Sequence, residues 1–149
     1  MSEATMGARR TENEMAVSPG KLWTGRVIAG LVALFLLFDA AMKFVQPKPV
    51  VESFVQTGWP IAVSSTLGAL LLVSTILYLI PRTAILGAIL LTGYLGGAVG
   101  ANVRLMNPLF SHTLFPVYFG VLVWGSLWLR DPKLQELVPL RQNRSLPPR

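Results

Sequence analysis

The sequence predicts an all-α, polytopic membrane protein, a single domain built as a bundle of four transmembrane helices. Of its 149 residues, 52% are hydrophobic and 13% are charged, whereas a soluble domain carries about 25% charged residues. The charged residues gather towards the two ends of the chain, and the middle holds few of them. Four apolar runs, separated by proline-containing breaks, are each long enough to cross a bilayer.

The first helix is predicted over residues 27–44. Residues 1–20 are polar, mixed in charge and without apolar periodicity, which predicts a disordered tail. Within this tail, Met15 is an alternative start of the chain. Lys21, Trp23 and Arg26 are typical of an anchor at the membrane interface. The 18 residues of the helix span about 27 Å, close to the bilayer core of about 30 Å.

A cleaved signal peptide is the alternative interpretation of this first segment. A basic stretch followed by the apolar run 27–38 permits it. The preceding segment, however, is long and contains acidic residues, and no A-x-A cleavage site follows. We therefore favour a helix that is retained in the membrane.

The second helix is predicted over residues 60–80. The sequence Q-P-K-P at residues 46–49 breaks the first helix, because proline removes a backbone donor and restricts the residue before it. Residues 50–56 then predict a short interfacial helix that ends at Gly58. The second transmembrane run contains no charged residue, and it ends at the tight turn 81–82.

The third helix is predicted over residues 83–103 and carries a glycine stripe. The stripe consists of two interleaved G-x-x-x-G pairs: Gly93, Gly96, Gly97 and Gly100. Glycine at this spacing removes side chains from one face and lets another backbone come close. Helix packing inside the bundle is the interpretation that we favour. A homodimer face and a ligand slot against bare backbone are the alternatives.

The fourth helix is predicted over residues 112–129, after a break at Asn107-Pro108. Two tryptophans and the sequence Arg-Asp-Pro mark its exit from the membrane. The membrane domain therefore covers residues 21–132. Residues 133–149 are basic and contain several prolines, which predicts a second tail.

The positions of the basic residues predict the orientation in the membrane. Four helices place both termini on one side, and that side holds ten of the 13 Lys and Arg residues. The other side holds Lys43, Lys48 and Arg104. Because Lys and Arg concentrate in cytoplasmic loops, both termini and both tails are expected in the cytoplasm. The net charge of +6 is explained by these Lys and Arg residues, which determine the orientation in the membrane.

The composition excludes several kinds of site. The chain has no cysteine, which excludes disulfides and thiolate metal sites, and its one histidine excludes a multi-histidine metal site. No phosphate-binding loop, nucleophile elbow or dinucleotide fingerprint occurs. No folded basic surface suited to nucleic acid is evident. We therefore expect no metal, no nucleic-acid partner and no encoded cofactor.

Five polar residues are the candidates for a site near the predicted outer face: Asp39, Lys43, Arg104, Asn107 and His112. Asp39 and Lys43 share one helix face, with the acid first. A lone carboxylate inside the membrane is costly unless it is paired. We expect it to pair with Lys43 or with Arg104, and a contact with Arg104 would join the first and third helices.

These candidates have two interpretations. The first is structural, with the ion pairs fixing the register of the helices. The second is a half-buried polar pocket, in which Lys43 and Arg104 donate to a quinone carbonyl, a head group or another acidic or carbonyl ligand. His112 or Asp39 would then exchange a proton. Tyr94 is assigned to the core in preference to the pocket wall.

The segments LFLLFDAAMKF, VVESFVQTGWP and GGAVGANVRLMNPLFSHTLFPVYFGVLVWGSLWLRDP resemble the DoxX-like family of small four-helix membrane proteins. The resemblance covers residues 25–132. It implies a four-helix bundle in a bacterial inner membrane. If the polar residues of the family are functional, they map onto the five candidates above.

The resemblance implies two classes of function. The wider DoxX group includes a membrane subunit linked to thiosulfate oxidation, with quinone as the acceptor, and this favours a quinone-associated component of a redox system. Some distant relatives act in the assembly of other membrane proteins, so a non-enzymatic assembly factor or accessory subunit is the alternative. The lipid bilayer is the expected environment, and a membrane-protein partner or a homo-oligomer is compatible with both. The sequence does not decide whether the chain is an enzyme.

Overall fold

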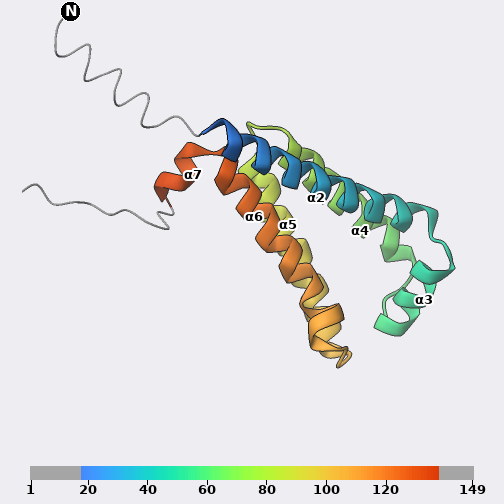
Figure 1. Cartoon of the computed structure of the whole chain (residues 1–149). Coiled ribbons are helices and arrows are strands. Elements are labelled where there is room, and N and C mark those ends of the chain that lie inside the picture. Colours follow the sequence, from blue (N-terminus) through green and yellow to red (C-terminus); the bar gives the residue numbers. More distant parts are fainter. Residues whose placement is uncertain (1–17, 138–149) are drawn as a thin grey trace, which may run out of the picture.

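The computed structural model describes residues 18–137, which form helices with no strand among them (Figure 1). The helices are α2 (Pro19–Val45), α3 (Lys48–Thr57), α4 (Ala62–Leu79), α5 (Ala84–Arg104), the π-helix η1 (Leu109–Thr113), α6 (Phe115–Arg130) and α7 (Pro132–Leu137). Four spans are long and apolar enough to cross a membrane, namely α2, α4, α5 and the stretch Leu109–Arg130. This confirms the prediction of an all-α protein with four membrane-spanning helices.

The ends of the helices differ from the predicted ends by a few residues in most cases. The largest difference is in α2, which begins at Pro19 rather than at residue 27. Proline fits the first turn of a helix, and no other proline interrupts α2. The start of the predicted second tail forms α7. The expectations for residues 1–17 and 138–149, including the alternative start of the chain, lie outside the described residues.

The four long helices form two arms. Helix α2 packs against α4 and α6, while α5 packs against α4 and α6. Figure 1 shows α2 and α4 running together as one arm and α5 and α6 as the other. The arms meet where α2 starts, α4 turns into α5 and α6 ends, which we call the terminal end. They diverge towards α3 and η1, which we call the α3 end.

The buried core follows from the packing of the two arms. Tyr78 on α4, Leu91 on α5 and Val123 on α6 are fully buried. The Tyr78 hydroxyl hydrogen-bonds with the Ser126 hydroxyl, so that this polar group is satisfied inside the core. At Gly87, an added Cβ would lie 2.2 Å from the backbone nitrogen of Tyr78. Glycine at this position therefore lets α4 and α5 approach closely.

The predicted glycine stripe has a different environment. A Cβ added at any of its four glycines, Gly93, Gly96, Gly97 and Gly100, would meet nothing within 4 Å. Each is exposed, and the buried residues of α5, such as Leu91 and Leu95, lie on another face. The interpretation that these glycines serve close packing inside the bundle is therefore wrong for the described residues. The close approach is made by Gly87 instead.

Helix α3 is a short connection between two left-handed residues. Gln46 has φ 51° and Gly58 has φ 69°, so the chain turns sharply before and after the helix. Phe54 is its buried residue. The backbone carbonyl of Thr57, the last residue of α3, accepts a hydrogen bond of 2.9 Å from Nη2 of Arg104 on α5. This bond joins α3 to the other arm.

Candidate functional site

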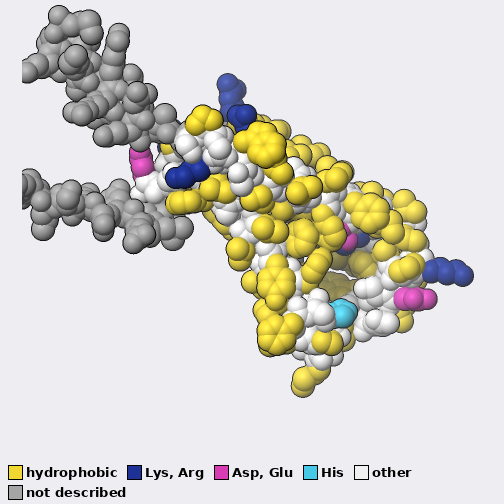
Figure 2. Space-filling view, viewed as in Figure 1, with side chains coloured by type: hydrophobic (Ala, Val, Ile, Leu, Met, Phe, Trp, Pro, Cys, Tyr) yellow, Lys and Arg dark blue, Asp and Glu magenta, His cyan; other side chains and the backbone are white. Residues whose placement is uncertain are grey.

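A hollow lies between the two arms at the α3 end. Figure 2 shows it, with an acidic and a basic side chain on its wall and the chain's one histidine at its rim. Two sets of contacts join the arms around it. The ring of Phe35 on α2 lies 4.5 Å from Phe119 and 5.8 Å from Phe115, between ring centroids. The bond between Arg104 and Thr57 is the second link.

Asp39 and Lys43 form an ion pair on α2. Nζ of Lys43 donates to both carboxylate oxygens of Asp39, at 2.7 and 2.6 Å. The Lys43 side chain is 14% exposed and that of Asp39 is 38% exposed. Four-residue spacing places the two groups on the same helix face, with the favoured order of acid before base. The predicted pairing of Asp39 with Lys43 is confirmed.

Tyr94 faces this pair from the opposite arm. Nζ of Lys43 lies 6.0 Å from the centroid of the Tyr94 ring, at the outer limit of a cation–π contact. Tyr94 also packs against the buried core. The sequence assigned Tyr94 to the core, and the structure places it at the boundary between the core and the charged pair. A signal was present in the sequence, because an aromatic with a hydroxyl in an apolar helix needs a polar surrounding.

Arg104 does not join this pair. Within the described part of the chain its guanidinium donates to the backbone carbonyl of Thr57 and makes no ion pair with Asp39. The predicted contact between Asp39 and Arg104 is therefore wrong. The arms diverge towards the end of α5, and Lys43 already satisfies the carboxylate from the same helix.

Asn107 and His112 belong to a second polar group near the end of α5. Nδ2 of Asn107 donates to Oδ1 of Asn102 at 2.8 Å, and Thr113 donates to the Asn107 carbonyl at 3.3 Å. The exposed His112 lies in η1, where Nδ1 and the Ser111 hydroxyl are 2.8 Å apart. No hydrogen bond described between residues 18 and 137 connects either residue to Asp39.

The five candidates thus divide into two clusters. The ion-pair cluster consists of Asp39 and Lys43, with Tyr94 opposite. The other three, Arg104, Asn107 and His112, follow one another at the end of α5 and in η1, and we call them the loop cluster. No hydrogen bond described between residues 18 and 137 joins Arg104 to the other two. Between residues 18 and 137 no group of three or more His, Cys, Asp or Glu side chains lies close enough to hold a metal ion. The arrangement suits a carbonyl-bearing or acidic organic ligand, because Lys43 and Arg104 are donors.

Comparison with known proteins matches the membrane domain. The model of the DoxX-like family matches residues 27–126. The matched region runs from α2 into α6 and contains both clusters. No curated protein and no solved structure matches the chain.

Proposed function

Given that the chain belongs to the DoxX-like family and has four membrane-spanning helices, we propose that this integral membrane protein is the quinone-binding component of a redox system. The ion pair of Asp39 and Lys43, which faces Tyr94 of the opposite arm, is the observation that carries the proposal. An ionisable group inside a transmembrane helix is costly, and it usually marks a site.

The position of the pair argues against a purely structural role. Asp39 and Lys43 lie on the same helix, so their ion pair does not fix one helix against another. Two apolar side chains would fill the same space without the cost of removing charges from water. A function that needs the charges explains why both are present.

The chemistry around the pair suits a quinone head group. The ammonium of Lys43 has three N–H donors, and the two contacts with Asp39 leave a third for a carbonyl oxygen. The ring of Tyr94 offers an aromatic face to a flat ligand. Asp39 is accessible enough to exchange a proton with a reduced quinone. Electrons would pass to or from a partner protein.

The charge distribution supports an orientation for this site. The terminal end carries five described basic residues, Lys21, Arg26, Arg82, Arg130 and Lys133, and the α3 end carries three, Lys43, Lys48 and Arg104. By the positive-inside rule the terminal end faces the cytoplasm. In a bacterial inner membrane, the hollow then opens towards the outer leaflet.

A binding titration tests the proposal. The purified protein is titrated with a short-chain ubiquinone analogue by isothermal calorimetry. We expect Lys43→Gln to raise the Kd at least about tenfold, since a hydrogen bond to a charged group contributes about 1.5–3 kcal/mol. Lys43→Arg should restore part of the affinity. Lys48→Gln, on exposed α3, is the matched control. The same Kd for Lys43→Gln and the unaltered chain would refute the site.

The open face of α5 favours a second function, that of an assembly factor or accessory subunit. Gly93, Gly97 and Gly100 share one face, and nothing in the described structure packs against them. Such a face lets a helix of another membrane protein approach closely. Because the chain has no cysteine, Gly97→Cys gives a single cross-linking site. Trapping a foreign subunit in cells would support this function, and an uncross-linked monomer would count against it.

A further inference from the structure

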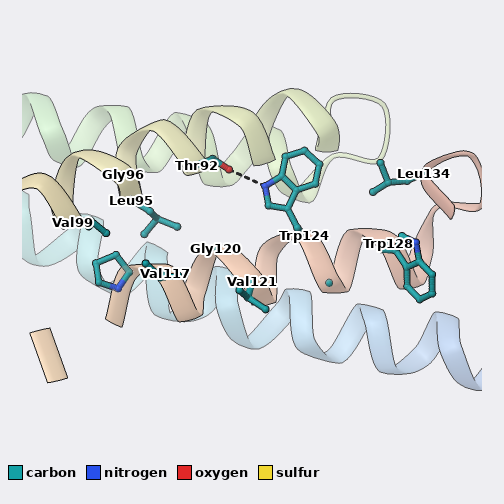
Figure 3. A pocket seen from close by; sticks show the side chains of 12 residues that line it. Thr92, Leu95, Gly96, Val99, Val117, Gly120, Val121, Trp124, Trp128 and Leu134 are labelled. Carbon is teal, nitrogen blue, oxygen red and sulfur yellow. Dashed lines mark hydrogen bonds between the residues drawn. The ribbon is translucent and has the colours of Figure 1, made fainter. Parts of the chain in front are cut away.

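A second concavity lies on the outer side of α5 and α6, apart from the hollow. This groove has a volume of about 610 Å³ and an almost wholly apolar lining. Thr92 and Gly96 on α5 and Gly120 and Trp124 on α6 line it, and Leu134 of α7 lines one end (Figure 3). Tyr94 lies on a different face of α5, so the groove is independent of the proposed quinone site.

Glycines and one tryptophan shape the groove. Gly96 and Gly120 carry no side chain, so the space between the two helices is not filled there. The indole Nε1 of Trp124 donates to Oγ1 of Thr92 at 2.9 Å, which holds the ring as a fixed wall (Figure 3). The bond also satisfies the indole N–H and the hydroxyl, so the groove presents apolar surface to its occupant.

The length and volume of the groove suit a small molecule or a single hydrocarbon chain. From Pro116 to Trp128 it follows α6 for about 18 Å. Small-molecule sites have volumes of about 300–1,000 Å³. Because α5 and α6 span the membrane, the molecules that reach this groove are those of the bilayer.

The charges near one end of the groove identify the class of lipid. Lys133 precedes the lining residue Leu134 in the sequence, and Arg82 lies in the turn between α4 and α5, at the terminal end of the bundle. The carboxylate of Asp131 accepts the backbone N–H of Lys133 at 2.9 Å. Among the described residues, the terminal end carries five basic side chains against two acidic ones, Asp131 and Glu136.

We propose that the groove between α5 and α6 binds one hydrocarbon chain of an anionic phospholipid, whose phosphate lies among the basic residues of the terminal end, Lys133 and Arg82 among them. The apolar groove selects the chain, and the basic end selects the charge of the head group. Basic residues at a membrane surface attract anionic lipids, by about fivefold in affinity for each residue.

Fluorescence quenching by brominated lipids tests this proposal. The chain has four tryptophans, and replacing Trp23, Trp59 and Trp128 by Phe leaves Trp124 as the reporter in the groove. Trp128 also lines the groove, and Phe keeps an aromatic ring at that position. The protein is reconstituted into phosphatidylcholine vesicles that contain increasing fractions of phosphatidylglycerol or phosphatidylcholine with brominated acyl chains. We expect brominated phosphatidylglycerol to quench Trp124 at a fraction at least about fivefold lower than brominated phosphatidylcholine.

Two variants separate the apolar and the charged parts of the site. A Cβ at Gly120 would contact only Leu95, at 4.0 Å, so the side chain of Gly120→Leu starts in open space and fills the groove, and quenching should lose its lipid preference. Gly30→Leu, at an open position on α2, is the matched control. Replacing Arg82 and Lys133 together by Gln should bring the two lipids to equal quenching.

Three results would overturn the proposal. The first is equal quenching by the two lipids in the single-tryptophan protein that carries no further replacement. The second is relief of quenching by a long-chain polyprenol at the same mole fraction as the anionic lipid, which would assign the groove to an isoprenoid chain. The third is loss of quenching as the protein-to-lipid ratio rises, which would assign it to a second copy of the chain.

Discussion

Asp39 and Lys43 form their ion pair within a little more than one turn of α2, so the pair assembles with the helix itself. Neither group needs the rest of the bundle to find its partner. The bundle instead determines how much water reaches them, and it leaves Lys43 14% exposed. The stability of the protein should therefore fall more when one partner is removed than when both are.

We expect Lys43→Leu to destabilise the protein by about 2 kcal/mol, because it leaves the carboxylate of Asp39 without its partner in a poorly hydrated place. Loss of one member of a fully buried pair costs about 3–5 kcal/mol, and the 38% exposure of Asp39 reduces this figure. The double replacement Asp39→Leu and Lys43→Leu should recover most of the stability. Thermal unfolding in detergent measures both, and a double variant less stable than Lys43→Leu would contradict the argument.

Two glycines of α5 should respond in opposite ways to the same substitution. At Gly87 an added Cβ would lie 2.2 Å from the Tyr78 backbone nitrogen, whereas at Gly93 it would meet nothing within 4 Å. Gly87→Ala should therefore destabilise the protein by more than about 2 kcal/mol, since backbone must move. Gly93→Ala should stabilise it by about 0.5–1 kcal/mol through helix propensity. Thermal unfolding compares them, and equal effects would count against the described packing.

These residues show what the sequence predicts well and what it does not. The pair of Asp39 and Lys43 was predictable, because both groups lie on one helix and helical spacing fixes their relation. The partner of Arg104 was not predictable, because it is a backbone carbonyl 47 residues away that only the folded arrangement brings near. For the glycines, spacing identifies a shared face but does not say which face meets a neighbour.

Among the helices, α3 is the least constrained by packing. It lies between the left-handed residues Gln46 and Gly58, and Phe54 is its buried side chain. The hydrogen bond between Arg104 and Thr57 links it to α5. The sequence predicted a short interfacial helix over residues 50–56, and the observed Lys48–Thr57 agrees closely. We therefore expect Arg104 to hold α3 in place.

Removal of the Arg104 side chain should loosen α3. In Arg104→Ala, the amides of α3 should exchange hydrogen about threefold to tenfold faster, because one hydrogen bond with a charged donor is lost at an exposed site. Mass spectrometry of the peptide covering residues 48–57 measures this. Arg82→Ala, at the opposite end of the bundle, is the control. Unchanged exchange in Arg104→Ala would show that Arg104 does not hold α3.

For the molecule as a whole, four apolar runs sufficed to predict the number, order and approximate ends of the spans. They did not predict the divergence of the two arms. Hydropathy reports how long a span is, while the angle between spans depends on where a small residue lets two helices meet, as Gly87 does against the backbone of Tyr78. The separation of the five polar candidates into two clusters follows from that angle.

Labelling of single introduced cysteines tests the proposed orientation directly, because the chain has no cysteine of its own. Leu109→Cys, 55% exposed at the α3 end, and Lys133→Cys, at the terminal end, each introduce a single thiol. A maleimide that does not cross membranes should label Leu109→Cys in intact spheroplasts, and Lys133→Cys only after lysis, as the positive-inside rule requires. The reverse pattern would invert the proposed topology.

The divergence of the arms also relates the hollow to the thickness of the bilayer. Transmembrane helices that tilt away from each other span a thinner hydrophobic layer than the same helices standing parallel. Hydrophobic mismatch therefore acts on the angle between the two arms. Lipids with short acyl chains should then favour a wide separation of the arms at the α3 end, and lipids with long acyl chains should favour a narrow one. The length of the surrounding fatty acids thereby becomes a mechanical control on how readily a ligand enters between the arms.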